Sequence, residues 1–267
     1  SDDSVEQMEV IIKNAIEKNI SEICFTDHVD YGIKIDHDIF KQMSDDEKQK
    51  FEKVLNVDYP NYFKEIETLK NKYKNQITIK QGLEFGIQTH TVKKFQQLFD
   101  SYDLDFIILS CHQANDKEFW NYNYQNGKTE DEYNLGYYEE IYKCIHLYHD
   151  YSILGHLDLI QRYNKTIYPF EKSRDIITKI LKKVIEDGKG IEVNTSSFAY
   201  KLKDLTPSKE ILKLYYELGG KIITIGSDSH KAESIGSHIP LIQQELKNIG
   251  FSHFCTFDKM EPVFHEL

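Results

Sequence analysis

The sequence predicts an α/β barrel built from about seven parallel strands. Amphipathic helices alternate with short apolar strands along most of the 267 residues, and this alternation is typical of parallel strands joined by right-handed crossovers. The length suits one such barrel. No repeat, low-complexity tract or Pro/Gly-rich linker divides the chain. We therefore expect residues 1–267 to form one domain.

The predicted elements follow one another in helix–strand order. Apolar residues at helical spacing predict helices at 4–19, 60–74, 90–100, 136–150, 171–187, 207–219 and 232–249. Short apolar runs that end in polar groups predict strands at 22–28, 77–86, 106–112, 152–158, 190–196 and 221–230, and a final strand is expected near 253–257. The charged or Asn- and Tyr-rich segments 32–59 and 113–135 are expected to be long loops over the barrel mouth.

Composition narrows the class of protein. The net charge is −11, which argues against a nucleic-acid partner, because nucleic-acid binders are usually basic. No apolar stretch approaches the ~18 residues of a membrane span, so no membrane association is expected. The four cysteines form no CxxC pair, which favours reduced thiols in a cytoplasmic protein. No feature of the sequence predicts an oligomeric state.

Metal-capable side chains stand at the ends of most predicted strands. A single residue of this kind is usually a cap or a solvated group. Here the pattern recurs at successive strands, and the carboxyl ends of barrel strands open on one face. Imidazole and carboxylate groups suit zinc, manganese or iron. The sequence therefore predicts a metal site made from His28, Glu84, His112, His156, Asp228 and His230.

These residues lie in short motifs that resemble a known family. The motifs Thr26–His28, Gly82–Glu84, Ser110–His112, Gly155–Asp158 and Gly226–His230 are similar to those of the PHP (polymerase and histidinol phosphatase) superfamily. The run Ile191–Ser196, followed by Leu205–Ser208, resembles its histidinol-phosphate phosphatase branch. The resemblance covers essentially the whole chain.

The resemblance implies a distorted (β/α)7 TIM-like barrel that binds two to three divalent ions of zinc, manganese or iron. One ion would be held by Asp3, His28 and His230, and a second by Glu84, His112 and His156. A third would be held by Glu84 and Asp228. The implied reaction is hydrolysis of L-histidinol phosphate to L-histidinol and phosphate by a metal-activated hydroxide, with Glu84, Asp228 and His230 at the catalytic centre.

Two departures from the family pattern affect this interpretation. The family begins with a His-x-His motif on its first strand, which this chain lacks. We expect that this strand is missing from the chain; a natural loss of the motif is the alternative. Ala199 stands where the branch usually carries a phosphate-binding arginine. Arg162 matches the other phosphate-binding arginine, and Lys201 is the nearest replacement for the lost one, although a lysine acts only as a point charge.

Three alternative functions remain open at this point. Ala199 favours a related phosphoesterase that acts on another phosphomonoester or a nucleotide. A natural loss of His-x-His would favour a non-catalytic metal-binding or regulatory module. A metal-dependent amidohydrolase also uses histidines at barrel strand ends, but it would lack the phosphate grip of Arg162.

Overall fold

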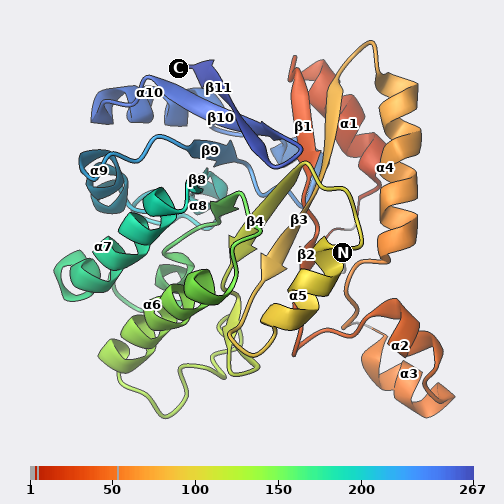
Figure 1. Ribbon diagram of the computed structural model, residues 1–267, viewed down its shortest axis with the longest axis horizontal. Coiled ribbons are helices and arrows are strands. Elements are labelled where there is room, and N and C mark those ends of the chain that lie inside the picture. Colours follow the sequence, from red (N-terminus) through yellow and green to blue (C-terminus); the bar gives the residue numbers. More distant parts are fainter. Residues whose placement is uncertain (1–3, 5, 53) are drawn as a thin grey trace.

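A computed structural model describes residues 4, 6–52 and 54–267, and its centre is a curled parallel sheet (Figure 1). The strands follow the order β1-β3-β4-β7-β8-β9, and β2 also pairs with β3. Their bounds are β1 Glu22–Phe25, β2 His28–Val29, β3 Thr78–Gly86, β4 Phe106–Ser110, β7 Ile153–Leu154, β8 Gly190–Asn194 and β9 Ile223–Gly226. The predicted α/β class and parallel sheet are confirmed, and all six predicted strand segments contain strands of this sheet.

Helices lie around the outside of the sheet (Figure 1). An apolar stripe at helical spacing explains their packing, as in α7, where Ile177, Ile180, Leu181 and Val184 are fully buried. The long helices are α1 Met8–Glu17, α4 Tyr59–Tyr73, α5 Val92–Phe99, α6 Glu130–Leu147, α7 Phe170–Glu186, α9 Lys209–Glu217 and α10 Ile239–Ile249.

In strand β3, side chains alternate between two faces, and this alternation separates core residues from a candidate site residue. Leu83 and Phe85 are fully buried, and Phe85 packs on Phe95 of α5 with 4.7 Å between ring centroids. Because successive side chains of a strand point to opposite faces, Glu84 is turned away from these helices and into the barrel. The core packing of β3 therefore fixes the direction of Glu84.

Both segments that were predicted as long loops contain regular elements. Within 32–59 lie α2 (His37–Lys41) and α3 (Asp45–Phe51), and Ser44 and Glu47 form a capping box at the start of α3. Within 113–135, β5 (Gln113–Ala114) and β6 (Lys117–Glu118) form a hairpin. Helix α6 begins earlier than predicted, because a second capping box, from Thr129 to Glu132, starts it.

The end of the chain also differs from the prediction of one final strand. Residues there form the antiparallel hairpin of β10 (His253–Asp258) and β11 (Glu261–Glu266), which contacts β9. Its turn is held by the backbone NH of Met260, which donates to the carbonyl oxygen of Asp105 at 2.9 Å. Short elements complete the fold, namely 3-10 helices η1 (Leu159–Tyr163) and η2 (Ala232–Ser234) and helix α8 (Ser196–Ala199).

The sheet is curled but open between its first and last strands. In the part of the chain that the structure describes, β1 pairs only with β3, and β9 pairs only with β8. A cavity of about 270 Å³ touches both strands, through Ile23 and Phe25 on one side and Ile225 on the other. The described residues thus form an open sheet, and its closure into a barrel of about seven strands stays a prediction.

None of the helices in the described ranges has the length and apolar character needed to cross a membrane.

Asp158 is a buried carboxyl that ties the loop after β7 to the start of α9. Only 4% of the residue is exposed. Its Oδ2 accepts a hydrogen bond from the backbone NH of Ser208 at 2.9 Å, whereas Oδ1 has no partner among the described residues. Burial raises the pKa of Asp158 to about 7. The folded protein therefore keeps a proton that the unfolded chain releases near its ordinary value of 3.8.

The contribution of Asp158 to stability should consequently fall as pH rises from about 4 to about 7. Asp158→Asn removes this titration, so between pH 5 and pH 8 its stability should gain on that of the wild type by about 3 kcal/mol. Urea unfolding of both proteins in the presence of a chelator, at pH 5 and pH 8, measures the effect. Asp38→Asn, whose side chain is 88% exposed, is the control. Parallel pH dependence of the wild type and Asp158→Asn would contradict the assignment.

Candidate metal centre

The register of the sheet brings the strand-end residues together. His28 on β2 lies opposite Glu84 on β3, and Gly86 lies opposite Ser110 on β4. His112 comes two residues after Ser110, and His156 two residues after β7. The Oε1 atom of Glu84 lies 3.1 Å from Nε2 of His112 and 2.9 Å from Nε2 of His156. Residues that are far apart in sequence thus share one carboxylate oxygen.

Glu84, His112 and His156 have the donor set and spacing of a metal site. One ligand atom from each residue lies within 4.8 Å of the other two, and the two Nε2 atoms are 3.4 Å apart. Two imidazole nitrogens and one carboxylate oxygen suit zinc and similar ions. The Ser110 hydroxyl donates to the same Glu84 oxygen at 2.6 Å. These residues fit the predicted second ion, and their role as ligands stays a prediction.

Burial and neighbouring charges have opposite effects on the pKa values of this cluster. Burial raises the pKa of Glu84, but His112 and His156 outweigh burial and hold it well below the ordinary value. Burial lowers the pKa of His112, but Asp30 and Glu84 outweigh it and raise that pKa to about 10. Without an ion, the cluster therefore holds a carboxylate beside an imidazolium. A metal ion that binds His112 has to displace a proton.

Asp30 belongs to the cluster although the sequence analysis missed it. Its Oδ2 lies 2.5 Å from Nδ1 of His28, and its Oδ1 lies 2.8 Å from Nδ1 of His112. Asp30 also forms a second group of possible metal donors with these two histidines. The amine of Lys34 lies 3.7 Å from Oδ2. The period-two alternation of a strand, which puts His28 and Asp30 on one face, was the available signal.

Asp228 and His230 follow β9 and line the same cavity as His28 and Glu84. The backbone of Asp228 is left-handed, with φ of 46°. Nδ1 of His230 lies 3.1 Å from the carbonyl oxygen of Asp228, and the His230 side chain is 46% exposed. Their roles as ligands stay predictions. Asp3, the third predicted ligand of the first ion, lies outside the described residues.

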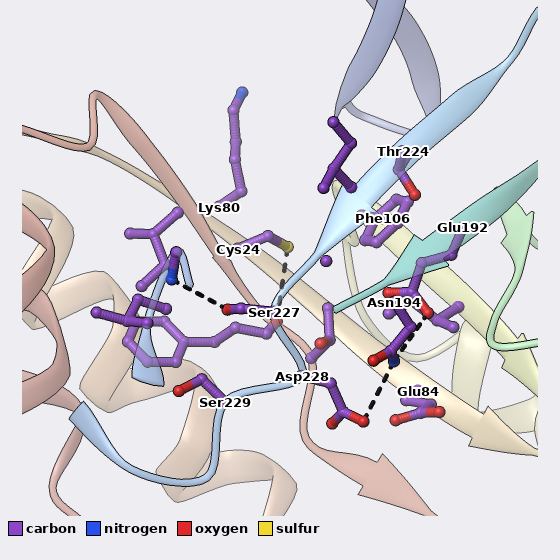
Figure 2. Close-up of a pocket in the computed structure, with 18 of the residues that line it drawn as sticks. Cys24, Lys80, Glu84, Phe106, Glu192, Asn194, Thr224, Ser227, Asp228 and Ser229 are labelled. Carbon is purple, nitrogen blue, oxygen red and sulfur yellow. Dashed lines mark hydrogen bonds between the residues drawn. The ribbon is translucent and has the colours of Figure 1, made fainter. Parts of the chain in front are cut away.

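Strand β8 contributes two buried polar residues that the sequence analysis also missed. Figure 2 shows Glu192 and Asn194 beside Glu84 and Asp228. Oε2 of Glu192 accepts hydrogen bonds from the His156 backbone NH and from Nδ2 of Asn194, both at 3.2 Å. Burial, together with Asp228 and Glu84, raises the pKa of Glu192 to about 7 against the opposing effect of His156. Polar residues at alternate positions of an apolar strand were the available signal.

A chain of hydrogen bonds connects Arg162 to Asp228. Nη2 of Arg162 donates to Oγ of Ser196 at 3.0 Å, and that hydroxyl donates to Oδ1 of Asn194 at 2.5 Å. Nδ2 of Asn194 then donates to Oδ2 of Asp228 at 3.2 Å. The guanidinium also lies over the ring of Tyr200, 3.9 Å from its centroid. Arg162 is thus held at a fixed place relative to the strand-end cluster.

Lys201 is placed differently from Arg162. It is exposed, its φ is 53°, and its amine forms no ion pair among the described residues. Ala199, at the end of α8, is also exposed. The predicted phosphate contact of Lys201 therefore stays a prediction, whereas the fixed position of Arg162 supports its predicted role.

Comparison with known proteins gives consistent matches. The PHP domain model matches residues 1–196. The chain is 31% identical to a histidinol-phosphatase of Lactococcus lactis subsp. lactis over 98% of its own length and 92% of that protein. It is 30% identical to a probable histidinol-phosphatase of Clostridium acetobutylicum over 100% of its own length and 93% of that protein.

Solved structures show the same likeness. A crystal structure of the histidinol phosphate phosphatase of Lactococcus lactis, complexed with zinc, L-histidinol and phosphate, matches with a TM-score of 0.83 and 30% identity. The match covers 98% of this chain and 95% of that one. A putative histidinol phosphatase of Listeria monocytogenes matches with a TM-score of 0.64 at 20% identity over 89% of this chain and 94% of that one, and so shares the fold.

Proposed function

This chain belongs to the PHP domain family, and on that premise we propose that it is a metal-dependent phosphomonoesterase that hydrolyses L-histidinol phosphate to L-histidinol and phosphate. The observation that carries the proposal is the convergence of His112 and His156 on one oxygen of Glu84, together with the hydrogen-bond chain that connects Arg162 to Asp228. The Lactococcus lactis protein, similar over nearly its whole length, was crystallised with zinc, L-histidinol and phosphate.

The site would hold two to three divalent ions of zinc, manganese or iron. The set of Glu84, His112 and His156 has the strongest support, because its donor atoms already lie together. His28 and His230, with Asp3, would hold another ion, and Glu84 with Asp228 a third. Bound ions of this kind lower the pKa of water and offset negative charge on phosphoryl oxygens.

The residues of the chain would then bind and orient the substrate. Arg162 offers a planar guanidinium that can form two parallel hydrogen bonds to a phosphate. Because Ser196 and Tyr200 hold it, little freedom is lost when the phosphate binds. Lys201 would contribute a more distant positive charge. Glu84, Asp228 and His230 would fix the position of the reacting centre.

Ala199 supports a second candidate within the same chemistry. No charged side chain replaces the missing arginine at this position of α8, so the phosphate grip depends mainly on Arg162. A phosphatase with one fixed arginine makes fewer directed contacts with its substrate. The alternative is therefore an enzyme that acts on another phosphomonoester. A panel of sugar phosphates, nucleotides and L-histidinol phosphate, compared by kcat/KM, separates the two.

The curled sheet would close into a (β/α)7 barrel between β1 and β9, and residues 1–267 would belong to one domain. The cavity that both of these strands line supports this closure. The four free cysteines support a reducing, cytoplasmic location.

Barrel closure has a direct consequence for backbone exchange. If the sheet closes into a barrel, the amides of β1 and β9 that point away from their described partners should be protected from hydrogen exchange, because closure would give them hydrogen-bond partners. Mass spectrometry of exchanged peptides from Glu22–Phe25 and Ile223–Gly226 measures this. Rapid exchange at both edges, with slow exchange in β4, would contradict closure.

Activity should depend on metal and on His230. The protein with added manganese or zinc should release phosphate from L-histidinol phosphate, and chelation should abolish the release. His230→Asn should lower kcat/KM at least about 100-fold, because a ligand is lost. His146→Asn, on the outer helix α6, is the matched control and should stay active. Activity that persists both after chelation and in His230→Asn would contradict the metal-dependent mechanism.

Arg162 should control phosphate affinity. Arg162→Ala should raise KM and the inhibition constant of inorganic phosphate by about 10- to 100-fold, the effect of losing charged hydrogen bonds. Arg162→Lys should recover only part of this loss, since an ammonium cannot bind the phosphate in a bidentate manner. Arg174→Ala, an exposed arginine on α7, is the control. An unchanged inhibition constant in Arg162→Ala would assign the phosphate to another residue.

A further inference from the structure

We propose that Asp30 is a positioning residue that holds the rings of His28 and His112 so that their Nε2 atoms face the metal centre. The inference rests on the proposed metal site and adds a residue that the predicted ligand set does not contain. It depends on the geometry of a single carboxylate between two imidazoles.

Each oxygen of Asp30 faces the Nδ1 atom of a different ring. Oδ2 lies 2.5 Å from His28, and Oδ1 lies 2.8 Å from His112. The two rings are nearly perpendicular, with an interplanar angle of 87° and 5.7 Å between centroids. An Nδ1–H that donates to Asp30 leaves Nε2 as the atom that can bind metal. In His112 this Nε2 is the atom that lies 3.1 Å from Glu84.

The backbone of Asp30 is held by Asn56, which is itself held by Asp36. The backbone NH of Asp30 donates to Oδ1 of Asn56 at 2.9 Å, and Nδ2 of Asn56 donates to Oδ1 of Asp36 at 2.8 Å. Asn56 is 2% exposed. The segment 32–59, which looks like a surface excursion, therefore fixes the backbone from which the Asp30 carboxylate projects.

Gly86 provides the space that Asp30 needs. A Cβ at this position would lie 1.9 Å from Oδ1 of Asp30 and 3.0 Å from Nδ1 of His112. Its backbone is extended within β3, so the requirement is for room. An added methyl group at this position would displace the Asp30 carboxylate from the His112 ring, and the carboxylate would keep its charge.

A ligand role for Asp30 is the competing explanation, because it lies within 4.8 Å of donor atoms of both histidines. The present geometry favours positioning, since both oxygens already face ring nitrogens at hydrogen-bond distance. Carboxylates that orient metal-binding histidines in this way typically change metal affinity 10- to 100-fold when removed.

Asp30→Asn gives a specific test of this geometry. The amide offers one acceptor and one donor, so it can accept from only one of the two Nδ1–H groups. The other ring would face the amide NH2, take its proton on Nε2 and lose its ligand atom. Competition with a chromogenic chelator should show zinc affinity reduced about 10- to 100-fold. Asp38→Asn, an exposed aspartate on α2, should bind zinc like the wild type.

Two further measurements keep the test decisive if Asp30→Asn folds poorly. Gly86→Ala should weaken zinc binding in the same direction although all ligands and charges remain. In the zinc-loaded wild type, long-range ¹H–¹⁵N spectra should place a proton on Nδ1 of both His28 and His112. Circular dichroism checks that each variant is folded.

The outcomes separate this inference from the function on which it rests. Zinc affinity equal to the wild type in folded Asp30→Asn or Gly86→Ala would overturn the role of Asp30 and leave the metal site intact. Nδ1 atoms without protons in the zinc-loaded wild type would also overturn it, and would make Asp30 a ligand. Absence of any zinc binding by the wild type would instead overturn the proposed function.

Discussion

The site depends on one carboxylate, that of Glu84, whose direction the core packing of its strand sets. Glu84 projects from near the carboxyl end of β3 because Leu83 and Phe85, on either side of it, are fully buried in the opposite direction. Turning β3 over, so that Glu84 points outward, would expose both apolar side chains, which costs roughly 1.5–3 kcal/mol for each. The hydrophobic core therefore sets where the negative charge lies, and His112, His156 and the Ser110 hydroxyl gather around it.

The parts of the molecule that local patterns determine could be predicted from the sequence. Apolar periodicity gave the outer helices, and short apolar runs gave the parallel strands, since both signals lie within a few neighbouring residues. The same logic placed Glu84, His112 and His156 at strand ends that open on one face. Helices α2 and α3 were missed, although the capping box of Ser44 and Glu47 is visible in the sequence.

Other features depend on contacts between distant segments, which no local pattern reveals. Asp30 reaches His112 only because β2 and β4 both pair with β3. Its support by Asn56 comes from a segment that is charged and appears irregular. The hairpin at 253–266 was predicted as one strand, because its exposed second half carries little apolar signal. Closure of the sheet between β1 and β9 likewise concerns segments that are far apart in the sequence.

The hydrogen-bond chain from Arg162 through Ser196 and Asn194 to Asp228 also has a thermodynamic meaning. An ion that binds the Asp228 carboxylate changes the hydrogen bond that Asn194 donates to this carboxylate. That change reaches the guanidinium of Arg162 through Ser196. Coupling between two binding sites is reciprocal. A phosphate held by Arg162 must then alter the affinity for the ion by the same factor by which the ion alters the affinity for phosphate. Under the proposed roles of Arg162 and Asp228, cofactor and substrate would be two ligands of one connected network.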